Sequence, residues 1–384
     1  MVIDGGLHVE RLSSVIDVDE GAWDQLVTGS NFYVSHAWLS SSSRTWSDWQ
    51  ACLVARDGGG RIVGGLPVQL VRQRTASLYD PAIVFAAAGG AIDPSAIFPF
   101  LLAGPRSGYC GEIPLAGERA GGAGSLVALL TALAEAAAET GARGQGLLFL
   151  RHEAAAGVRQ PLADAGYTVF VQSFEVRLQV PWTSFDQHVG WLPSKRRNVV
   201  RKDDQHPGAH GLRVERTRLA GHEATIAPLA ANVERRYGHS ADAAALERTL
   251  RGQTAACGAY SVLFLLMDGD RVVGYSSHFE WRGTLFLRSV GFDYEHPHVR
   301  GAYFTLALYE PLRYAMERGL TELHLGTEGY QAKVLRGGLV WPLWAAVQAP
   351  PLGEPEARAL VQAGRARALE MEAALNRPVQ GLTA

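Results

Sequence analysis

The two halves of this chain repeat one order of local patterns, and no other feature of the sequence restricts the fold as much. In the first half, strand patterns at 51–56 and 61–70 flank a glycine-rich turn, as in a β-hairpin. A helix pattern rich in Ala and Leu follows at 125–140, and an apolar strand pattern covers 146–150. Residues 167–180 then alternate like a pair of strands.

The second half shows the same order. Strand patterns cover 260–267, 271–281 and 284–292, with short polar turns between them. A helix pattern at 304–318 ends at a glycine, and a strand pattern follows at 320–325. A repeated order of this kind indicates an old duplication, in which each copy has a hairpin, a helix and a parallel strand.

We therefore predict an α/β fold (an α+β mixed sheet) made of two tandem domains that are related by internal duplication. A length of 384 residues suits two domains. The predicted boundaries are 1–180 for the N-terminal domain and 181–350 for the C-terminal domain. Residues 351–384 are rich in Ala, Arg and Glu and form a predicted helical tail, either a docking or dimer element or a solvated helix.

Charge and cysteine content exclude several classes of protein. A net charge of −2 argues against bulk binding to nucleic acid or to an anionic membrane, although a local basic patch is compatible with it. Cys52, Cys110 and Cys257 are widely spaced, which argues against a disulfide framework and a structural zinc site. No run of 18 apolar residues and no signal-peptide pattern occur, so we expect a cytoplasmic protein without membrane insertion.

A cluster of basic residues opens the second half. Lys195, Arg197, Arg201 and Lys202 lie within eight residues of predicted helix, where residues about four apart share a face. Such like charges repel one another unless an anion lies between them, so a phosphate, a carboxylate or the acceptor end of a tRNA would stabilise the cluster. The alternative is a solvated basic helix.

These patterns together resemble the GNAT (acetyltransferase-type) superfamily, in particular the double-GNAT group that contains the Fem-type aminoacyl-tRNA-dependent transferases. The resemblance spans roughly residues 8–345 and rests on three motifs: the basic run 195–202, the segment 301–320, and 326–338, which is similar to the Gly-x-x-x-Tyr-Lys type ending of the family. The long helical arm of the Fem enzymes has no counterpart here, so the acceptor stays open.

The resemblance implies a glycine-containing loop that binds the pyrophosphate of the acyl donor at a helix N-terminus. Two loops are candidates. The first contains Arg119, Gly122 and Gly124 and leads into the helix at 125–140. The second contains Arg300, Gly301 and Tyr303, and Tyr303 replaces the small residue that the family has there. The alternative for the first is a flexible Gly/Ala loop.

Two further groups of residues are candidates for chemistry. Glu328, Tyr330 and Lys333 follow the last predicted strand of the repeat, where open α/β sheets carry sites. Lys333 would hold a donor phosphate or an acceptor carboxylate, and Tyr330 would orient or protonate the leaving group. His278 and Glu280 share one face of a strand where GNAT enzymes usually place a base, and an ordinary histidine pKa suits that task. The alternatives are structural roles for all five.

The function that these residues predict is N-acyl transfer, in which an acyl or aminoacyl group passes to an amine of a small molecule or peptide. We expect the active site on the second domain. No tightly bound cofactor is expected, and the co-substrate is either aminoacyl-tRNA or acyl-coenzyme A. The alternative is a GNAT-like binding or scaffold protein without catalysis.

Overall fold

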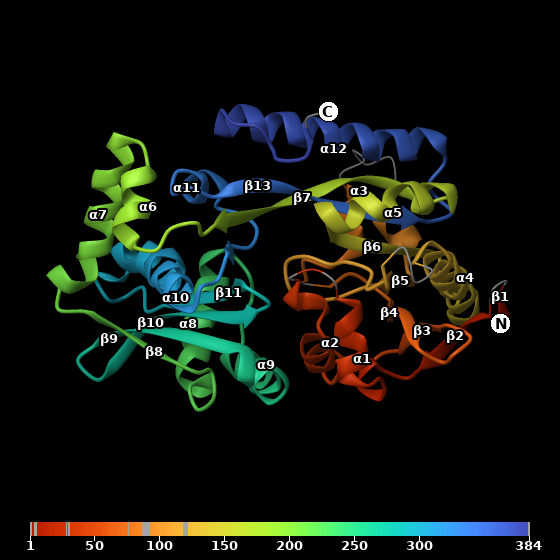
Figure 1. Cartoon of the computed structure of the whole chain (residues 1–384), viewed down its shortest axis with the longest axis horizontal. Coiled ribbons are helices and arrows are strands. Elements are labelled where there is room, and N and C mark those ends of the chain that lie inside the picture. The colour runs from red at the N-terminus through yellow and green to blue at the C-terminus, as the bar shows by residue number, and fades with distance from the viewer. Residues whose placement is uncertain are drawn as a thin grey trace. The chain divides into compact units, whose positions relative to one another are not determined.

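The computed structural model describes residues 2–3, 6–27, 29, 31–75, 77–86, 93–117 and 122–382. The chain divides into two compact units (Figure 1). Unit 1 comprises Met1–Glu175 and Trp341–Ala384, and unit 2 comprises Val176–Val340. This division differs from the predicted boundaries, because residues 341–384 group with the N-terminal part of the chain.

Unit 1 contains a mixed sheet in the order β1-β2-β3-β4-β5-β6-β13-β7. Strands β5 and β6 are parallel, whereas β2 with β3, β3 with β4, β4 with β5 and β6 with β13 pair in antiparallel orientation. The strands are β1 (Val2–Ile3), β2 (Leu7–Leu12), β3 (Gln50–Arg56), β4 (Ile62–Val71), β5 (Phe100–Ala103), β6 (Gly144–Arg151), β7 (Thr168–Gln179) and β13 (Leu339–Gln348).

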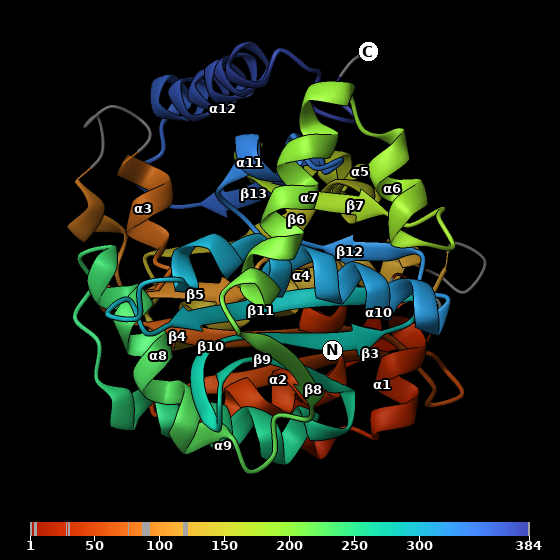
Figure 2. The same cartoon turned by 90° about the vertical axis from the view of Figure 1, so that its left-hand side faces the viewer.

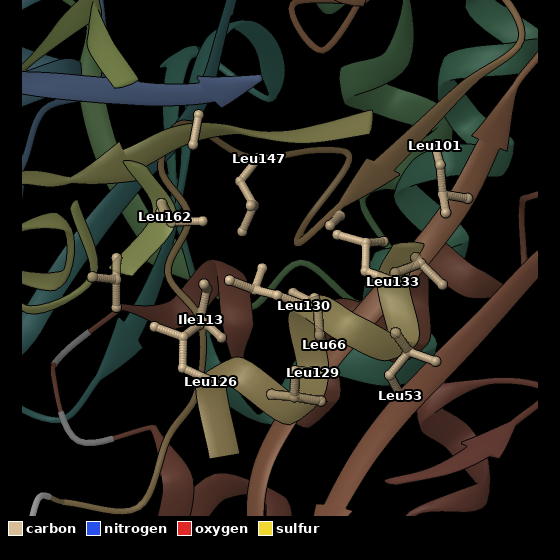
Figure 3. Packing of buried hydrophobic residues seen from close by; sticks show 14 of the residues in the cluster. Leu53, Leu66, Leu101, Ile113, Leu126, Leu129, Leu130, Leu133, Leu147 and Leu162 are labelled. Carbon is tan, nitrogen blue, oxygen red and sulfur yellow. The ribbon is translucent and has the colours of Figure 1, made fainter. Parts of the chain in front are cut away.

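Helices cover both faces of this sheet, because alternate residues of a strand point to opposite sides. Leu53 of β3 belongs to a core with α4 (Gly122–Thr140) and α5 (His152–Asp164), and Figure 3 shows Leu129 and Leu133 of α4 beside Leu66. The neighbouring Val54 instead packs with Trp23 of α1 (Glu20–Leu26) and with α2 (His36–Ser43).

In unit 2 the strands lie in the order β7-β12-β11-β10-β9-β8 and are again mixed in direction. Strands β11 and β12 are parallel, and the other pairs are antiparallel. The strands are β8 (Arg213–Thr217), β9 (Ser261–Asp268), β10 (Arg271–Trp281), β11 (Thr284–Phe292) and β12 (Glu322–His324). The helices are α6 (Phe185–Trp191), α7 (Ser194–Ala209), α8 (Glu223–Arg236), α9 (Ala243–Cys257), α10 (Glu310–Arg318) and α11 (Tyr330–Val334).

The helices of unit 2 also lie on both faces of their sheet (Figure 2). Tyr275 of β10 packs with Ile226 of α8 and Leu250 of α9. The next residue, Ser276, points to the opposite face, where its Oγ donates to the carbonyl of Leu306 at 2.6 Å. Leu306 belongs to a π turn over Thr305–Tyr309 that leads directly into α10. The predicted helix at 304–318 is therefore confirmed, with an irregular first turn.

The predicted repeat is present, but the last strand of each copy is exchanged. In the first copy β7 follows α5, and in the second copy β13 follows α11. Strand β13 nevertheless pairs with β6 in unit 1, where Leu343 lies opposite Arg151. Strand β7 pairs with β12 in unit 2, where Leu178 lies opposite Leu323. Each unit thus takes its final strand from the other copy of the repeat.

Two expectations about the ends of the copies need correction. Residues 167–180 form the single strand β7, not a pair, because Thr168–Gln179 contains no Gly or Pro at which a turn would begin. Residues 351–384 contain the helix α12 (Glu354–Leu375), which packs on β7: Nη1 of Arg367 donates to the carbonyls of Val171 and Gln172, at 3.1 and 2.6 Å. No helix in the described ranges has the length and apolar character needed to cross a membrane.

Candidate active site in the second unit

The loop after β12 has an unusual backbone that positions a buried lysine. Gly326, Glu328 and Gly329 all have left-handed φ angles, of 73°, 62° and 58°. Glycine adopts this conformation freely, but a glutamate there is held at some cost in energy, which occurs most often at functional sites. Helix α11 begins directly after this turn at Tyr330.

Lys333 turns back from α11 into this loop. Its side chain is only 7% exposed, and its Nζ donates to the carbonyls of Leu325 at 2.7 Å and Thr327 at 3.0 Å. Burial lowers the pKa of the ammonium to about 8, and the nearby carboxylate of Glu328 acts in the opposite direction. Two of the three N–H groups of the ammonium thus donate to backbone carbonyls. The amine sits where it can change protonation near neutral pH.

A second buried group lies one helical turn farther along the chain. Arg336 is 8% exposed; its Nε donates to the hydroxyl of Tyr309 at 2.8 Å and its Nη2 to Oδ2 of Asp203 at 2.5 Å. The Tyr309 hydroxyl in turn donates to the same carboxylate oxygen at 3.2 Å, and burial raises the pKa of this phenol. The guanidinium lies 3.4 Å from the ring centroid of Phe304. The residues form one satisfied polar network.

A second set of ion pairs fixes α7 against α10. Nη2 of Arg313 on α10 donates to Oδ2 of Asp204 at 2.7 Å, and its Nη1 donates to Glu310 at the same distance. The Arg313 guanidinium also lies 4.1 Å from the ring centroid of Phe185 on α6. The two acidic residues of α7 are therefore paired internally.

This pairing leaves the first half of α7 basic. Lys195, Arg201 and Lys202 are exposed, and within the described part of the chain no ion pair joins them to a carboxylate. Arg197 is half-buried, and its Nε donates to the carbonyl of Leu192 at 2.8 Å. The predicted basic helix is present, and Asp203 connects it directly to Arg336 near the lysine loop.

Two of the predicted catalytic residues lie elsewhere. His278 is 1% exposed; its Nε2 contacts Ser276 Oγ at 3.0 Å, and burial lowers its pKa to about 3. A neutral imidazole without access to water does not act as a base toward an ammonium in solution, so the buried position of His278 does not support the predicted role. Burial acts to raise the pKa of Glu280, but hydrogen bonds from Arg318 and Tyr314 lower it overall. Glu280 is thus part of an ion pair that holds α10 to β10.

The second predicted donor loop is closed over its glycine. The imidazole of His206, at the end of α7, packs against Gly301 so closely that a Cβ there would lie 2.3 Å from Nε2. The same nitrogen lies 2.9 Å from the carbonyl oxygen of His298. Arg300 is exposed and Tyr303 is half-buried, with its ring against Phe304. This packing occupies the glycine surface that a donor pyrophosphate would approach.

The first predicted donor loop belongs to unit 1. Arg119 lies outside the described residues. Gly122 is the first residue of α4. Gly124 is exposed, and a Cβ added there would lie 3.1 Å from the side chain of Leu7, which is a tight contact. The long helix that was predicted at 125–140 is present, but it begins three residues earlier, so Gly122 and Gly124 belong to its first turn and not to a loop before it.

Sequence reasoning missed two sets of residues in unit 2. Asp203, Tyr309 and Arg336 meet although they are far apart in the chain, and no spacing signals this contact. His206, His210 and His298 each place one ring nitrogen within 4.8 Å of the others. His206 and His210 are four residues apart at the end of a helix, so they share a face, and this spacing was the available signal.

Comparison with known proteins defines the class of this fold. Three solved structures are similar over most of the chain. FemX is 12% identical, covers 88% of this chain and 96% of its own, and has a TM-score of 0.58. The C-terminal domain of a putative lysylphosphatidylglycerol synthetase from Agrobacterium fabrum is 12% identical, with coverages of 89% and 95% and a TM-score of 0.55, and L-PGS from Bacillus licheniformis is 10% identical, with coverages of 90% and 97% and a TM-score of 0.54. Together with the repeated order of elements, they show a tandem GNAT fold. No curated protein sequence matches the chain.

The family follows from the sequence itself. A family model for FemAB-like proteins, described as peptidoglycan biosynthesis/recognition, matches residues 14–351. This chain therefore belongs to the FemAB-like family. The match includes both copies of the repeat and the whole of the candidate site.

Proposed function

We propose that this protein is an N-acyltransferase, which transfers an acyl or aminoacyl group to an amine of a small molecule or peptide, with its chemistry at the loop 325–336 of unit 2. Membership of the FemAB-like family supports acyl or aminoacyl transfer. The observation that carries the proposal is Lys333, a buried amine whose Nζ is aimed by two backbone carbonyls at the end of β12.

Acyl transfer from an ester or thioester develops negative charge on the carbonyl oxygen and then on the leaving group. Lys333 has one N–H left beyond its two carbonyl contacts, and in a buried site a donor of this kind stabilises such charge by several kcal/mol, on the order of 3. A pKa of about 8 keeps the group largely protonated at pH 7. Tyr330, in the first turn of α11, is the second proposed contact to the leaving group.

We propose aminoacyl-tRNA as the acyl donor. Lys195, Arg201 and Lys202 give α7 three exposed cations without carboxylate partners in the described structure, which suits a phosphate backbone. Gly301 is covered by His206, so the second-unit loop lacks the open glycine surface that a coenzyme A pyrophosphate would use. Both observations favour a polyanion along α7 over a coenzyme A ester at this loop.

Acyl-coenzyme A is the alternative donor, and one observation supports it. In unit 1, α4 begins at Gly122 and runs through Thr140, so its N-terminus provides backbone N–H groups and a helix dipole for a phosphate. This donor would bind in unit 1.

The test is to offer both donors and to identify new amides. The purified protein is incubated with a mixed pool of charged tRNA or with acetyl-coenzyme A, beside a panel of amines that includes peptidoglycan stem peptides, and products are identified by mass spectrometry. We expect amide formation that ribonuclease abolishes. Ribonuclease-resistant transfer from coenzyme A would instead establish the alternative donor.

Lys333→Gln is the matched test of the site. Glutamine keeps the length and part of the hydrogen bonding of the buried side chain but lacks the charge, so we expect transfer to fall by about 10²–10³-fold, as for loss of one charge-stabilising donor. Circular dichroism and thermal unfolding check that the variant is folded. Undiminished transfer by a folded variant would contradict the role of Lys333, and no transfer by either protein across the panel would favour the scaffold alternative.

A further inference from the structure

A cluster of three histidines lies in unit 2 outside the lysine loop. His206 and His210 come from the end of α7, and His298 begins the short turn Val299–Ala302 between β11 and the π turn. One ring nitrogen of each lies within 4.8 Å of the other two. The three imidazoles therefore lie together, although they come from two segments that are about 90 residues apart in the chain.

The rings are arranged so that lone pairs are available. His210 and His298 stack at a centroid distance of 3.8 Å with an interplanar angle of 9°. Such face-to-face contact suits neutral imidazoles, because two imidazolium cations would repel. A neutral imidazole carries one free lone pair.

The ring of His206 is held by a contact typical of metal ligands. Nε2 of His206 lies 2.9 Å from the carbonyl oxygen of His298. A carbonyl only accepts, so this nitrogen carries the proton and Nδ1 holds the lone pair. Carbonyl contacts of this kind fix the tautomer of metal-bound histidines. The contact between His206 and Gly301 also fixes the ring in place.

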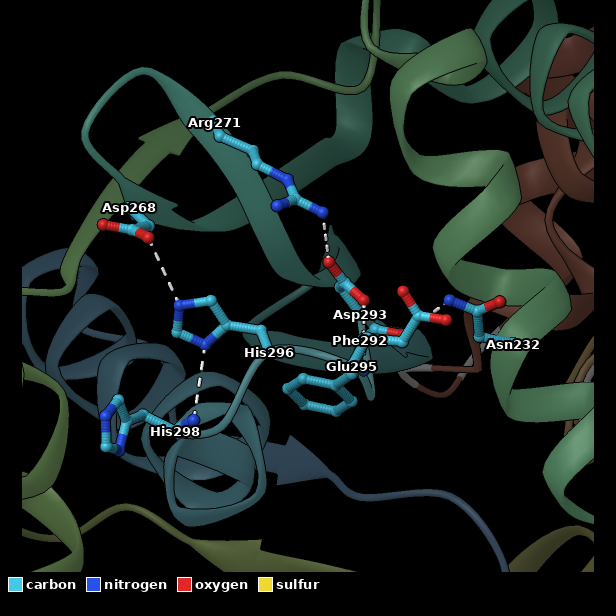
Figure 4. Close-up of polar contacts among 8 residues, drawn as sticks. All are labelled: Asn232, Asp268, Arg271, Phe292, Asp293, Glu295, His296 and His298. Carbon is cyan, nitrogen blue, oxygen red and sulfur yellow. Dashed lines mark hydrogen bonds and ion pairs between the residues drawn. The ribbon is translucent and has the colours of Figure 1, made fainter.

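His298 is positioned through its neighbour His296, as Figure 4 shows. The backbone N–H of His298 donates to Nδ1 of His296 at 3.3 Å. Nε2 of His296 must then carry the proton, and it contacts Oδ2 of Asp268 at 3.3 Å. The carboxylate thus orients His296, which in turn holds the backbone of the residue that carries the third imidazole.

We infer that His206, His210 and His298 form a binding site for a divalent transition metal ion, of which Zn²⁺ is the expected occupant. Three neutral imidazoles suit Zn²⁺, whereas Mg²⁺ and Ca²⁺ require oxygen ligands. Three protein ligands leave the fourth tetrahedral position for water or an anion. The ion joins the end of α7 to the turn before α10, so it stabilises the loop that carries Arg300 and Gly301.

The exposed His210 turns toward the ion without disturbing the core. His206 and His298 are half-buried, while His210 is exposed at the end of α7, so rotation of its ring converts the stacked pair into converging ligands. For the same reason His210→Ala removes a ligand without creating a cavity.

The test uses protein without an affinity tag, first dialysed against a chelator. Zn²⁺ is titrated by calorimetry, and Co²⁺ is titrated by visible absorption, because four-coordinate cobalt gives intense bands whereas six-coordinate cobalt gives weak ones. We expect one ion per chain, four-coordinate cobalt bands, a higher melting temperature with Zn²⁺ and no binding of Mg²⁺.

His210→Ala and His298→Ala are the test variants, and His239→Ala is the matched control. His239 is also exposed, but it pairs with Glu234 away from the cluster. Each test variant should lose more zinc affinity than the roughly 10–100-fold that loss of an outer partner costs, and the control should bind as the parent does. Zinc binding that is absent, six-coordinate with cobalt, or unchanged by His210→Ala would overturn the inference. If His298→Ala fails to fold, His210→Ala alone decides.

Discussion

Lys333 and His278 show how the place of a titratable residue decides its role. Both side chains are buried in unit 2, and burial lowers the pKa of both. Lys333 reaches an irregular loop at the end of a strand, where we propose that its remaining N–H donor contacts a substrate group. His278 lies in the middle of β10, covered by the π turn and by Phe264, so it stays neutral and structural.

Lys333 predicts a change of stability with alkaline pH. Its pKa is 10.5 in the unfolded chain and about 8 in the folded one. Between these values the unfolded chain holds a proton that the folded chain has released, so the folded state gains stability as pH rises. Between pH 7 and pH 10.5, the free energy of unfolding of the parent protein should increase by on the order of 2–3 kcal/mol relative to that of Lys333→Met. Urea unfolding at several pH values measures this, and a constant difference would contradict it.

His278 predicts a change in the acid range. Its pKa is 6.5 in the unfolded chain and about 3 in the folded one. As pH falls from 6.5, the unfolded chain takes up a proton that the folded chain does not, so stability is lost. Urea unfolding between pH 7 and pH 4 should show that the free energy of unfolding decreases less for His278→Gln than for the parent protein. Both proteins retain His188, whose pKa burial lowers to about 4, so the comparison isolates His278.

Helix α7 is the element that combines the candidate functions of unit 2. Its first half carries exposed cations, its middle pairs Asp203 and Asp204 with Arg336 and Arg313, and its end carries the histidine cluster. The pairing of both aspartates explains why a helix with acidic residues still presents a basic surface. It also places the proposed tRNA contact and the proposed metal site on one rigid element.

A triple substitution in α7 tests the basic surface. Replacing Lys195, Arg201 and Lys202 with Ala should weaken tRNA-dependent transfer and reduce the slope of log affinity against log salt by roughly 2–3, because each lost phosphate contact contributes about 0.7–0.9. The matched control replaces three exposed arginines elsewhere, Arg143, Arg248 and Arg365. An equal loss in both variants would show that general charge, and not α7, attracts the RNA. Filter binding and transfer assays provide the readouts.

The exchange of final strands is a property of the whole molecule. Strand β13 completes the sheet of unit 1, and residues 177–179 of β7 pair with β12 in unit 2. Separation of the two copies of the repeat by a cut in the chain therefore removes a strand from each unit. The unpaired edges of β6 and β12 would then expose backbone N–H and C=O groups.

Two fragments of similar length test this exchange. Residues 181–350 follow the predicted domain boundaries but lack the part of β7 that pairs with β12. Residues 176–340 follow unit 2 as it is folded. We expect the second fragment to unfold cooperatively and the first to aggregate or to unfold at a lower temperature. Thermal unfolding followed by circular dichroism, with the whole chain as reference, distinguishes them, and equal stability would argue against a stabilising role for the exchange.

The sequence by itself determined the elements and their repetition. Strand and helix periods are local properties, so the hairpin at 51–70, the helix at 125–140 and the loop with Lys333 were predictable. The basic helix was also predictable, because its charges lie within eight residues. The same local information placed His278 on a strand but not in the core.

Only the tertiary structure decided which residues meet. Strand pairing depends on backbone hydrogen bonds, which the sequence pattern does not specify, so the exchange of β7 and β13 was not visible. The contact of Asp203 with Arg336 joins residues 133 apart, and the histidine cluster joins α7 to a distant turn. Burial then fixes the charge of Lys333 and His278, because desolvation depends on every element packed around a group and not on its neighbours in the chain.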